Sequence, residues 1–219
     1  MTSQAAHPIL VLASSSPRRR DLLARLGVIF EAFAADVNEE ACAGEEPEAL
    51  ARRLSQAKAR ALADRRPGAL ILASDTVVTR HGELLGKPLD AADATRMLRS
   101  LRHTDHLVIT AVTGLDAAQG RELTLVSMST VWMRNYTDDE LAAYIASGDP
   151  QDKAGAYAIQ HPTFAPVARL DGCYSGVMGF PLGHVVEILT ALGVAVPGSA
   201  ATACQGWRGV CCQSTNAAP

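Results

Sequence analysis

The stretch that decides the fold lies near the start of the chain and reads Leu12-Ala13-Ser14-Ser15-Ser16-Pro17-Arg18-Arg19-Arg20-Asp21-Leu22-Leu23. The apolar run from Ile9 to Ala13 is typical of a buried strand. Ser16 is a favourable N-cap and Pro17 suits the first helical position, so a helix is predicted to begin here and to stop at Gly27. The stretch therefore predicts a strand, a tight polar turn and a helix.

Three arginines, Arg18, Arg19 and Arg20, fall in the first turn of that helix. This end of a helix is already partly positive and normally attracts Asp or Glu. A bound anion would resolve the conflict, because free backbone N–H groups and arginine forks both bind phosphate. The alternative is a solvated basic patch. The strand and the serine-rich turn beside the arginines favour a phosphate site.

Length and composition indicate an ordinary globular protein. The 219 residues, 48% of them hydrophobic and 20% charged, suffice for one large α/β domain or two small lobes. The net charge of −3 argues against a general nucleic-acid-binding surface. We find no apolar run of membrane-spanning length and no signal peptide, so no membrane association is expected.

The cysteines give little support for a zinc site or a disulfide framework, because their number is odd and no C-x-x-C pair occurs. They are Cys42, Cys173, Cys204, Cys211 and Cys212. Reduced thiols and a cytoplasmic location are therefore expected.

The next segments are predicted to form a strand over Val28 to Ala34 and a long helix from Pro47 to about Ala63. An acidic cluster over residues 36–40 lies between them, and such clusters are usually solvated. Lys58 falls near the middle of the helix, where a surface lysine is the default.

The compact apolar run Ala69 to Ala73 is typical of a central strand, and it is followed by Ser74-Asp75-Thr76. Ligands of α/β proteins bind at the carboxyl ends of such strands. Asp75 also has apolar neighbours, so its carboxylate needs a metal, an arginine or backbone donors. The alternative is an Asp that caps a turn. A hairpin around residues 81–82 then brings Lys87, in Gly86-Lys87-Pro88, back towards Asp75.

The second half of the chain alternates helices and strands. The predicted elements are a helix capped by Asp90, an antiparallel pair over His106–Leu115 and Leu123–Met133, a helix with a capping box from Thr137 to Gly148, a polar loop from Asp149 to Gln160 that becomes a short strand, and a last helix from Gly183 to Leu192. We assign residues 1–196 to one domain and 197–219 to a poorly ordered tail.

Several separated blocks resemble the Maf family of nucleoside triphosphate pyrophosphatases. They are Leu12-Ala13-Ser14-x-Ser16-Pro17-Arg18-Arg19, Ser74-Asp75-Thr76-Val77-Val78 with Gly86-Lys87-Pro88, Thr110-Ala111-Val112, Asp152-Lys153-Ala154-Gly155-Ala156-Tyr157-x-Ile159-Gln160, and a looser block over 172–182. They occur in the family's order and together span about residues 8–193.

The resemblance implies a Maf/ITPase-like α/β fold, with a curved mixed sheet, flanking helices and two lobes around a central cleft. It implies hydrolysis of a nucleoside triphosphate to the monophosphate and pyrophosphate, dependent on Mg²⁺ or Mn²⁺. Homodimers are common in the family. The block that ends at Gln160 is similar to the branch that acts on dTTP and UTP, and modified pyrimidine triphosphates are further candidate substrates.

The same resemblance assigns the site residues. Asp75 corresponds to the proton acceptor, and Arg18, Thr76 and Gln160 match positions linked to substrate choice. Chemistry agrees, since a carboxylate can accept a proton or hold a metal, and fixed cations and N–H donors stabilise phosphate charge. The expected catalytic residues are Asp75 and Lys87, the expected substrate-binding residues are Ser14, Arg18, Arg19, Lys58, Thr76, Lys153 and Gln160, and the expected metal ligands are Asp75 and Glu39.

The sequence departs from the family pattern at Asn38, where an acidic residue is common, and Glu39 is the adjacent substitute. His161-Pro162 also follows Gln160 where the family usually continues with glycine. Two alternatives therefore stay open. One is the same chemistry with another base preference, and the other is a nucleotide-binding regulator of cell division or septum formation.

Overall fold

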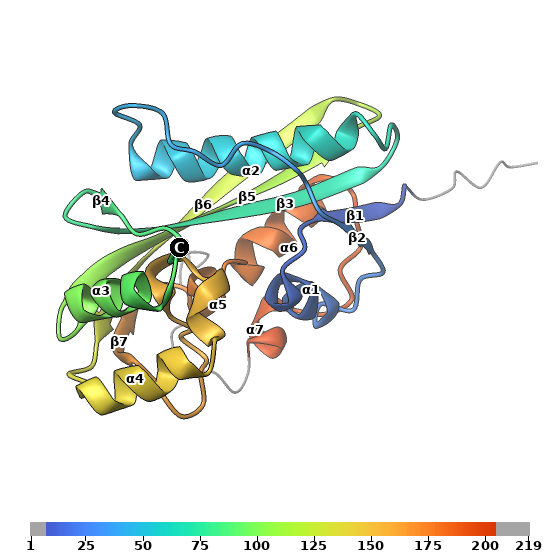
Figure 1. Ribbon diagram of the computed structural model, residues 1–219. Coiled ribbons are helices and arrows are strands. Elements are labelled where there is room, and N and C mark those ends of the chain that lie inside the picture. Colours follow the sequence, from blue (N-terminus) through green and yellow to red (C-terminus); the bar gives the residue numbers. More distant parts are fainter. Residues whose placement is uncertain (1–7, 205–219) are drawn as a thin grey trace, which may run out of the picture.

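The computed structural model describes residues 8–204, and within them one mixed seven-stranded sheet is flanked by helices (Figure 1). The strands are β1 (Leu10–Ala13), β2 (Glu31–Phe33), β3 (Leu70–Arg80), β4 (Glu83–Leu84), β5 (Asp105–Asp116), β6 (Arg121–Met133) and β7 (Val167–Asp171). The helices are α1 (Pro17–Ala24), α2 (Pro47–Ala63), α3 (Ala91–Leu101), α4 (Asp138–Ala146), α5 (Tyr174–Val177), α6 (Leu182–Ala191) and α7 (Ala200–Ala203), with 3₁₀ turns η1 (Asp149–Asp152) and η2 (Ala154–Ala156). The predicted α/β class and the mixed sheet with flanking helices are confirmed.

The strands follow the order β2-β1-β3-β5-β6-β7, and β4 pairs with β3. β1 runs parallel to β2 and β3, and the other pairs are antiparallel. On one side of β3, the pairing with β1 ends at Leu72 and the pairing with β4 begins at Thr79. The middle of β3 is therefore bonded to β5 on one side and has no neighbouring strand on the other.

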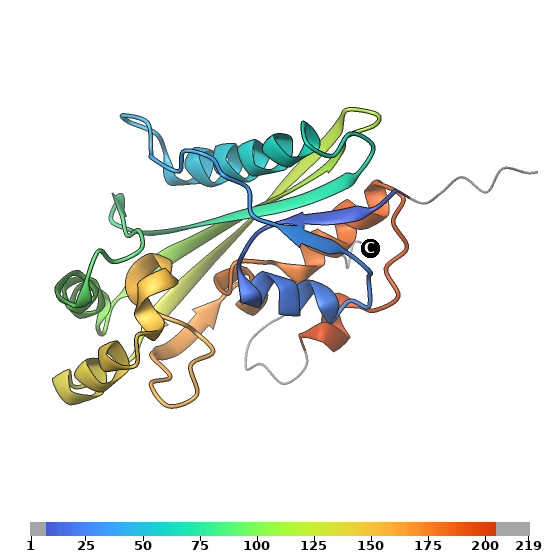
Figure 2. The ribbon, with the colours of Figure 1, turned by 45° about the vertical axis from the view of Figure 1, so that its right-hand side comes forward.

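Helices cover the two faces of the sheet unequally. α2 lies along one face, where Leu50 and Leu54 pack against Val77 of β3 (Figure 1). The opposite face carries two separate apolar clusters, one with α1 and α6 around Leu72 and one with α3 and α4 around Val78. Figure 2 shows these two groups of helices as separate bodies beneath the sheet. This division produces the two expected lobes.

β3 corrects one prediction. The strand does not end at Ala73 but continues to Arg80, and Asp75 pairs with Ala111 in an unbroken ladder with β5. Asp75 therefore lies in the middle of a strand and not at its carboxyl end. A strand can hold such polar residues here because Ser74, Asp75 and Thr76 all find side-chain partners.

Two further predictions of strands were wrong in extent or type. The second strand is confined to Glu31–Phe33, and residues 149–160 contain η1 and η2 but no strand. Gly148 and Gly155 adopt φ values of 75° and 70°, which an extended strand does not contain. The chain therefore turns repeatedly between them.

The long helices follow the predictions closely, whereas β7 and α5 were not predicted. α2 spans Pro47–Ala63, Asp90 caps α3 by accepting a 2.8 Å bond from the Asp93 N–H, and Thr137 forms the capping box of α4. The structure assigns residues 200–203, within the predicted tail, to α7, and Gly198 N–H donates to Leu26 O at 2.9 Å. Residues 205–219, with Cys211 and Cys212, lie outside the described range. Of the described helices, none is both long and apolar enough to cross a membrane.

Candidate active site

A cleft of about 550 Å³ opens between the lobes at the middle of β3. All ten residues that the sequence nominated line this cleft. They are Ser14, Arg18, Arg19, Glu39, Lys58, Asp75, Thr76, Lys87, Lys153 and Gln160. They come from the β1–α1 turn, the loop before α2, α2 itself, β3, the loop after β4 and the η1–η2 segment, so the fold brings together residues up to 146 positions apart, from Ser14 to Gln160.

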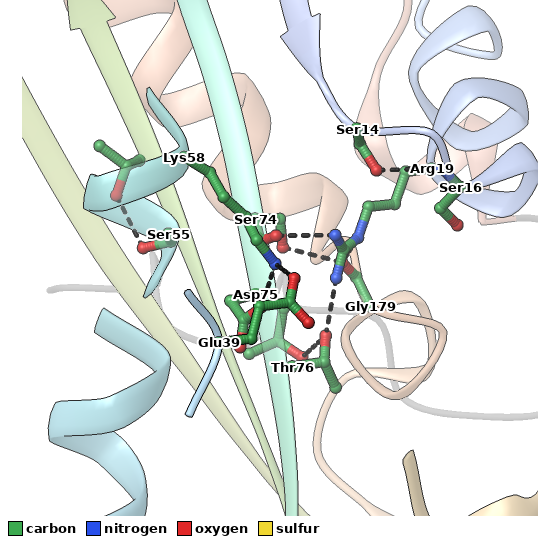
Figure 3. Close-up of polar contacts among 12 residues, drawn as sticks. Ser14, Ser16, Arg19, Glu39, Ser55, Lys58, Ser74, Asp75, Thr76 and Gly179 are labelled. Atoms are coloured by element: carbon green, nitrogen blue, oxygen red, sulfur yellow. Dashed lines mark hydrogen bonds and ion pairs between the residues drawn. The ribbon is translucent and has the colours of Figure 1, made fainter. Parts of the chain in front are cut away.

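Asp75, Lys58 and Glu39 form the charged centre of the cleft (Figure 3). Lys58 Nζ lies 2.6 Å from Asp75 Oδ1 and 2.6 Å from Glu39 Oε1. Lys58 and Asp75 are each 7% exposed, so the lysine is buried and not on the surface as helical position alone suggested. Asp75 Oδ2 has no hydrogen-bond partner within residues 8–204, and Figure 3 shows it pointing away from Lys58.

Thr76 follows Asp75 in β3 and therefore points to the other face of the sheet. Its Oγ1 lies 3.0 Å from Thr110 Oγ1 and accepts a 3.3 Å bond from Arg19 Nη2. Thr110 in turn donates to Gly176 O at 2.8 Å. The Thr76 hydroxyl is thus part of a network that joins β3 and β5 to the end of α5.

Arg19 is bound by the protein on three sides (Figure 3). Besides Thr76, its Nη1 donates to Ser74 O at 2.7 Å and its Nε to Gly179 O at 2.9 Å. Burial lowers the pKa of the guanidinium, and the charge of Asp75 opposes that shift. The Arg19 side chain therefore joins the unpaired edge of β3 to the loop before α6.

Lys153 is also held by the protein. The lysine is 7% exposed, and its ammonium group donates to Asp149 O, to Asp149 Oδ1 at 3.0 Å and to Asp152 Oδ1 at 2.7 Å. These acceptors use all three of its protons. Asp152 also binds Arg18 Nη1 at 3.1 Å, a contact that was not predicted because Asp152 stands in the sequence only as part of a motif, 134 residues from Arg18.

The turn at Ser14 has a different polar contact from the expected one. Ser16 occupies the N-cap position of α1 but makes no side-chain capping bond, and Ser14 Oγ instead accepts from the Ser16 N–H at 3.2 Å. Lys87 Nζ lies 3.8 Å from Glu39 Oε2 and is largely exposed. Gln160 is half-buried, and its amide has no hydrogen-bond partner among residues 8–204. Lys87 and Gln160 are therefore available to a ligand.

Two carboxylates could hold a cation here. Burial opposes ionisation of Glu39, but its hydrogen bond to Lys58 and the charges of Lys58, Lys87 and Arg19 outweigh burial and lower its pKa. The described residues contain no cluster of three His, Cys, Asp or Glu side chains suited to a metal. Mg²⁺ needs only one or two carboxylates when waters and substrate phosphates complete its shell, so Asp75 and Glu39 fit that ion.

Asn38 does not join this centre. Its Oδ1 accepts a 2.9 Å bond from the Glu40 N–H, which closes a short turn, and Asn38 is not among the residues that line the cleft. The next residue, Glu39, is the one whose carboxylate reaches Lys58. A one-residue offset therefore decides which side chain of this loop faces the cleft.

Comparisons with known proteins agree with this architecture. The family model described as Maf-like protein matches residues 9–192. The chain is 45% identical over 184 residues to the dTTP/UTP pyrophosphatase of Geobacter metallireducens, which covers 84% of this chain and 96% of that protein. It is 47% identical to the dTTP/UTP pyrophosphatases of Ralstonia nicotianae and Myxococcus xanthus, with 84% and 88% of this chain and 94% and 97% of those proteins covered. The chain belongs to the Maf family.

Proposed function

We propose that this protein hydrolyses dTTP and UTP to the nucleoside monophosphate and pyrophosphate. The observation that carries the proposal is the buried Asp75 carboxylate, bound to Lys58 through one oxygen and free at the other, in a cleft that also holds Gln160. The names of the related proteins support the same reaction and the same substrates.

The triphosphate binds among fixed positive groups. Arg18 at the start of α1, Lys58 from α2 and Lys87 after β4 supply the charge, and the turn after β1 supplies backbone N–H groups. The Lys58 ammonium has three protons and, among the residues that the structure describes, bonds only to Asp75 and Glu39, so one proton has no acceptor there. That proton points to a phosphate contact from the same ammonium that holds the base.

Asp75 acts as the general base. Its free Oδ2 accepts a proton from a water molecule, and the water oxygen bonds to the α phosphorus while the bond to the bridging oxygen breaks and pyrophosphate leaves. Lys58 orients Asp75 and compensates its buried charge, because the ammonium lies 2.6 Å from Oδ1. A divalent cation held by Asp75 and Glu39 would neutralise phosphate charge and lower the pKa of a bound water.

Gln160 selects the base. Its amide offers one acceptor and two donors, which match the O4 and N3 edge of uracil or thymine. The cleft beside it is lined by apolar side chains, including Leu85, Val108 and Met178, which suit the faces of a planar base.

The decisive experiment measures pyrophosphate release from a panel of nucleoside triphosphates, with Mg²⁺ or Mn²⁺ and then with a chelator. We expect turnover on dTTP and UTP that is lost on chelation. Turnover on a purine triphosphate instead would keep the mechanism and overturn the assigned specificity. Binding without turnover on any substrate would favour the regulator.

Asp75→Asn tests the base within the same assay. We expect kcat to fall by at least about a thousandfold with nucleotide binding retained. Asp116→Asn is the matched control, because Asp116 is also 7% exposed in the same sheet but lies outside the cleft. Equal losses in both variants would indicate a general effect on the fold and would remove Asp75 from the mechanism.

A further inference from the structure

Arg18 has its countercharge on the other lobe. It lies in the first turn of α1, where no acidic residue is present, and its Nη1 bonds Asp152 Oδ2 at 3.1 Å across a sequence separation of 134. Asp152 is the only hydrogen-bond partner of the Arg18 side chain in the part of the chain that the structure describes. The pair therefore spans the cleft, from α1 on one side to η1 on the other.

Asp152 is also held by a residue of its own turn. Its other oxygen, Oδ1, accepts a 2.7 Å bond from the buried Lys153, whose remaining protons go to Asp149. Burial has the largest single effect on the pKa of Asp152 and raises it, but Lys153 and Arg18 together outweigh burial and lower the pKa. The carboxylate is thus held between two cations, with Oδ2 bonded to Arg18 on the other lobe and Oδ1 bonded to Lys153 of its own turn.

The same chain of contacts reaches the segment that carries Gln160. Asp149 Oδ2 accepts from the Tyr144 hydroxyl at 2.7 Å, and that hydroxyl accepts from the Ala158 N–H at 3.0 Å. Ala158 stands two residues before Gln160. One network, from Arg18 to Ala158, therefore connects the arginine beside the phosphate turn with the segment proposed to read the base.

We infer that Asp152 is a positioning residue that sets the direction of the Arg18 guanidinium and couples it to the Gln160 segment. An ion pair whose side chains are 25% and 60% exposed contributes little to folding stability, so its effect lies in geometry. Arg18 has four further N–H donors, and Asp152 holds the fork at the mouth of the cleft where these donors meet the nucleotide. This inference rests on the proposed function and names the residue that prepares that site for its substrate.

The test is Asp152→Asn in the full chain, with dTTP or UTP as the substrate. Wild-type turnover is measured first, because its absence would refute the proposed function and not the coupling. We expect KM to rise about tenfold with kcat within twofold, since Arg18 binds the substrate but does not take part in the proton transfer. Asp152→Glu keeps the carboxylate, and its KM is expected to lie between that of Asp152→Asn and that of the wild type. Asp139→Asn, an exposed acid in the same lobe, is the control and should leave both constants unchanged.

A double-mutant cycle separates positioning from support of the loop through Lys153. In an Arg18→Ala background, Asp152→Asn should change KM less than twofold, because the group it positions is gone. A tenfold effect that persists without Arg18 would overturn the inference. So would an unchanged or lower KM in the single variant, the latter because it would mean that Asp152 withholds Arg18 from the substrate. Thermal unfolding of each variant shows whether the protein assayed is folded. If Asp152→Asn is not folded, the KM of Asp152→Glu is used for the test.

Discussion

Two lysines in the cleft, Lys58 and Lys153, have the same 7% exposure and are satisfied in different ways. Lys153 bonds to Asp149 and Asp152 of its own turn, one and four residues away, and all its protons are used. Lys58 reaches from α2 to Asp75 on β3 and to Glu39 in a distant loop, which leaves one proton unused. The difference teaches that burial of a charge does not identify its role, whereas the origin and number of its acceptors do.

The largest expected effect comes from Lys58→Met. Without the ammonium, the buried Asp75 carboxylate loses its countercharge and its hydrogen-bond donor and is left beside the carboxylate of Glu39. We expect kcat/KM to fall by about a thousandfold, measured by pyrophosphate release at several pH values. Arg60→Met, two residues along α2 and paired with Glu122 outside the cleft, is the control. An equal loss in Arg60→Met would make the Lys58 effect one of helix stability.

The next largest expected effect is on the pH dependence of the free energy of unfolding. His106 packs against Tyr157 in the same lobe as Lys153, with Nε2 2.8 Å from the Tyr157 hydroxyl, and burial lowers its pKa to about 4. The His106 imidazole takes up a proton near pH 6.5 in the unfolded chain but only near pH 4 in the folded chain. Its contribution to the free energy of unfolding is therefore fully present above pH 6.5 and is lost as the pH falls towards 4.

That loss is about 3 kcal/mol, from about 1.4 kcal/mol per pH unit over the interval. His106→Gln should flatten the curve of unfolding free energy between pH 6.5 and 4, measured by urea denaturation. Glu39 behaves differently, because its lowered pKa removes stability only below its ordinary value of 4.5. A variant curve that still fell steeply between pH 6.5 and 5 would assign the transition to another group.

Lys153→Met should lower stability more than activity. Removing the ammonium leaves Asp149 and Asp152 without their shared donor, and both acids are partly exposed, so we expect a loss of about 2 kcal/mol rather than the larger cost of a fully buried pair. For a chain of this size that is a fall of roughly 4–8 °C in Tm. The folded variant should keep kcat within about threefold. A thousandfold loss of kcat without a change in Tm would mean that Lys153, like Lys58, acts in catalysis and not in stability.

The smallest effect is on base choice. Gln160→Ala removes the amide that is unpaired within the described residues, and we expect the ratio of kcat/KM for UTP over CTP to fall about tenfold, the value of one good hydrogen bond. The measurement is the two rates under the same metal conditions. Gln151→Ala, an exposed glutamine in η1, is the matched control. An unchanged ratio would assign base selection to other residues of the cleft.

Local sequence signals predicted much of the fold. α2, α3 and α4 follow from apolar periodicity and from Pro47, Asp90 and the Thr137 capping box, because these act within a few residues. β3 was predicted too short, since Ser74, Asp75 and Thr76 resemble the end of a strand until their distant partners are known. The segment 149–160 was predicted as a polar loop that becomes a short strand, because the positive φ values of Gly148 and Gly155 leave no trace in the hydrophobic pattern.

The sequence by itself determined ten of the residues that line the cleft, since three motif blocks supply eight of them and Glu39 and Lys58 are the other two. Only the tertiary structure decided which of these side chains bond to the protein and which are available to a ligand. Arg19 and Lys153 look like phosphate ligands in sequence, yet their donors bond to carbonyls and carboxylates of the protein. The physical reason is that a hydrogen bond depends on positions set by the whole sheet and both lobes, whereas residue type and spacing report only local preference.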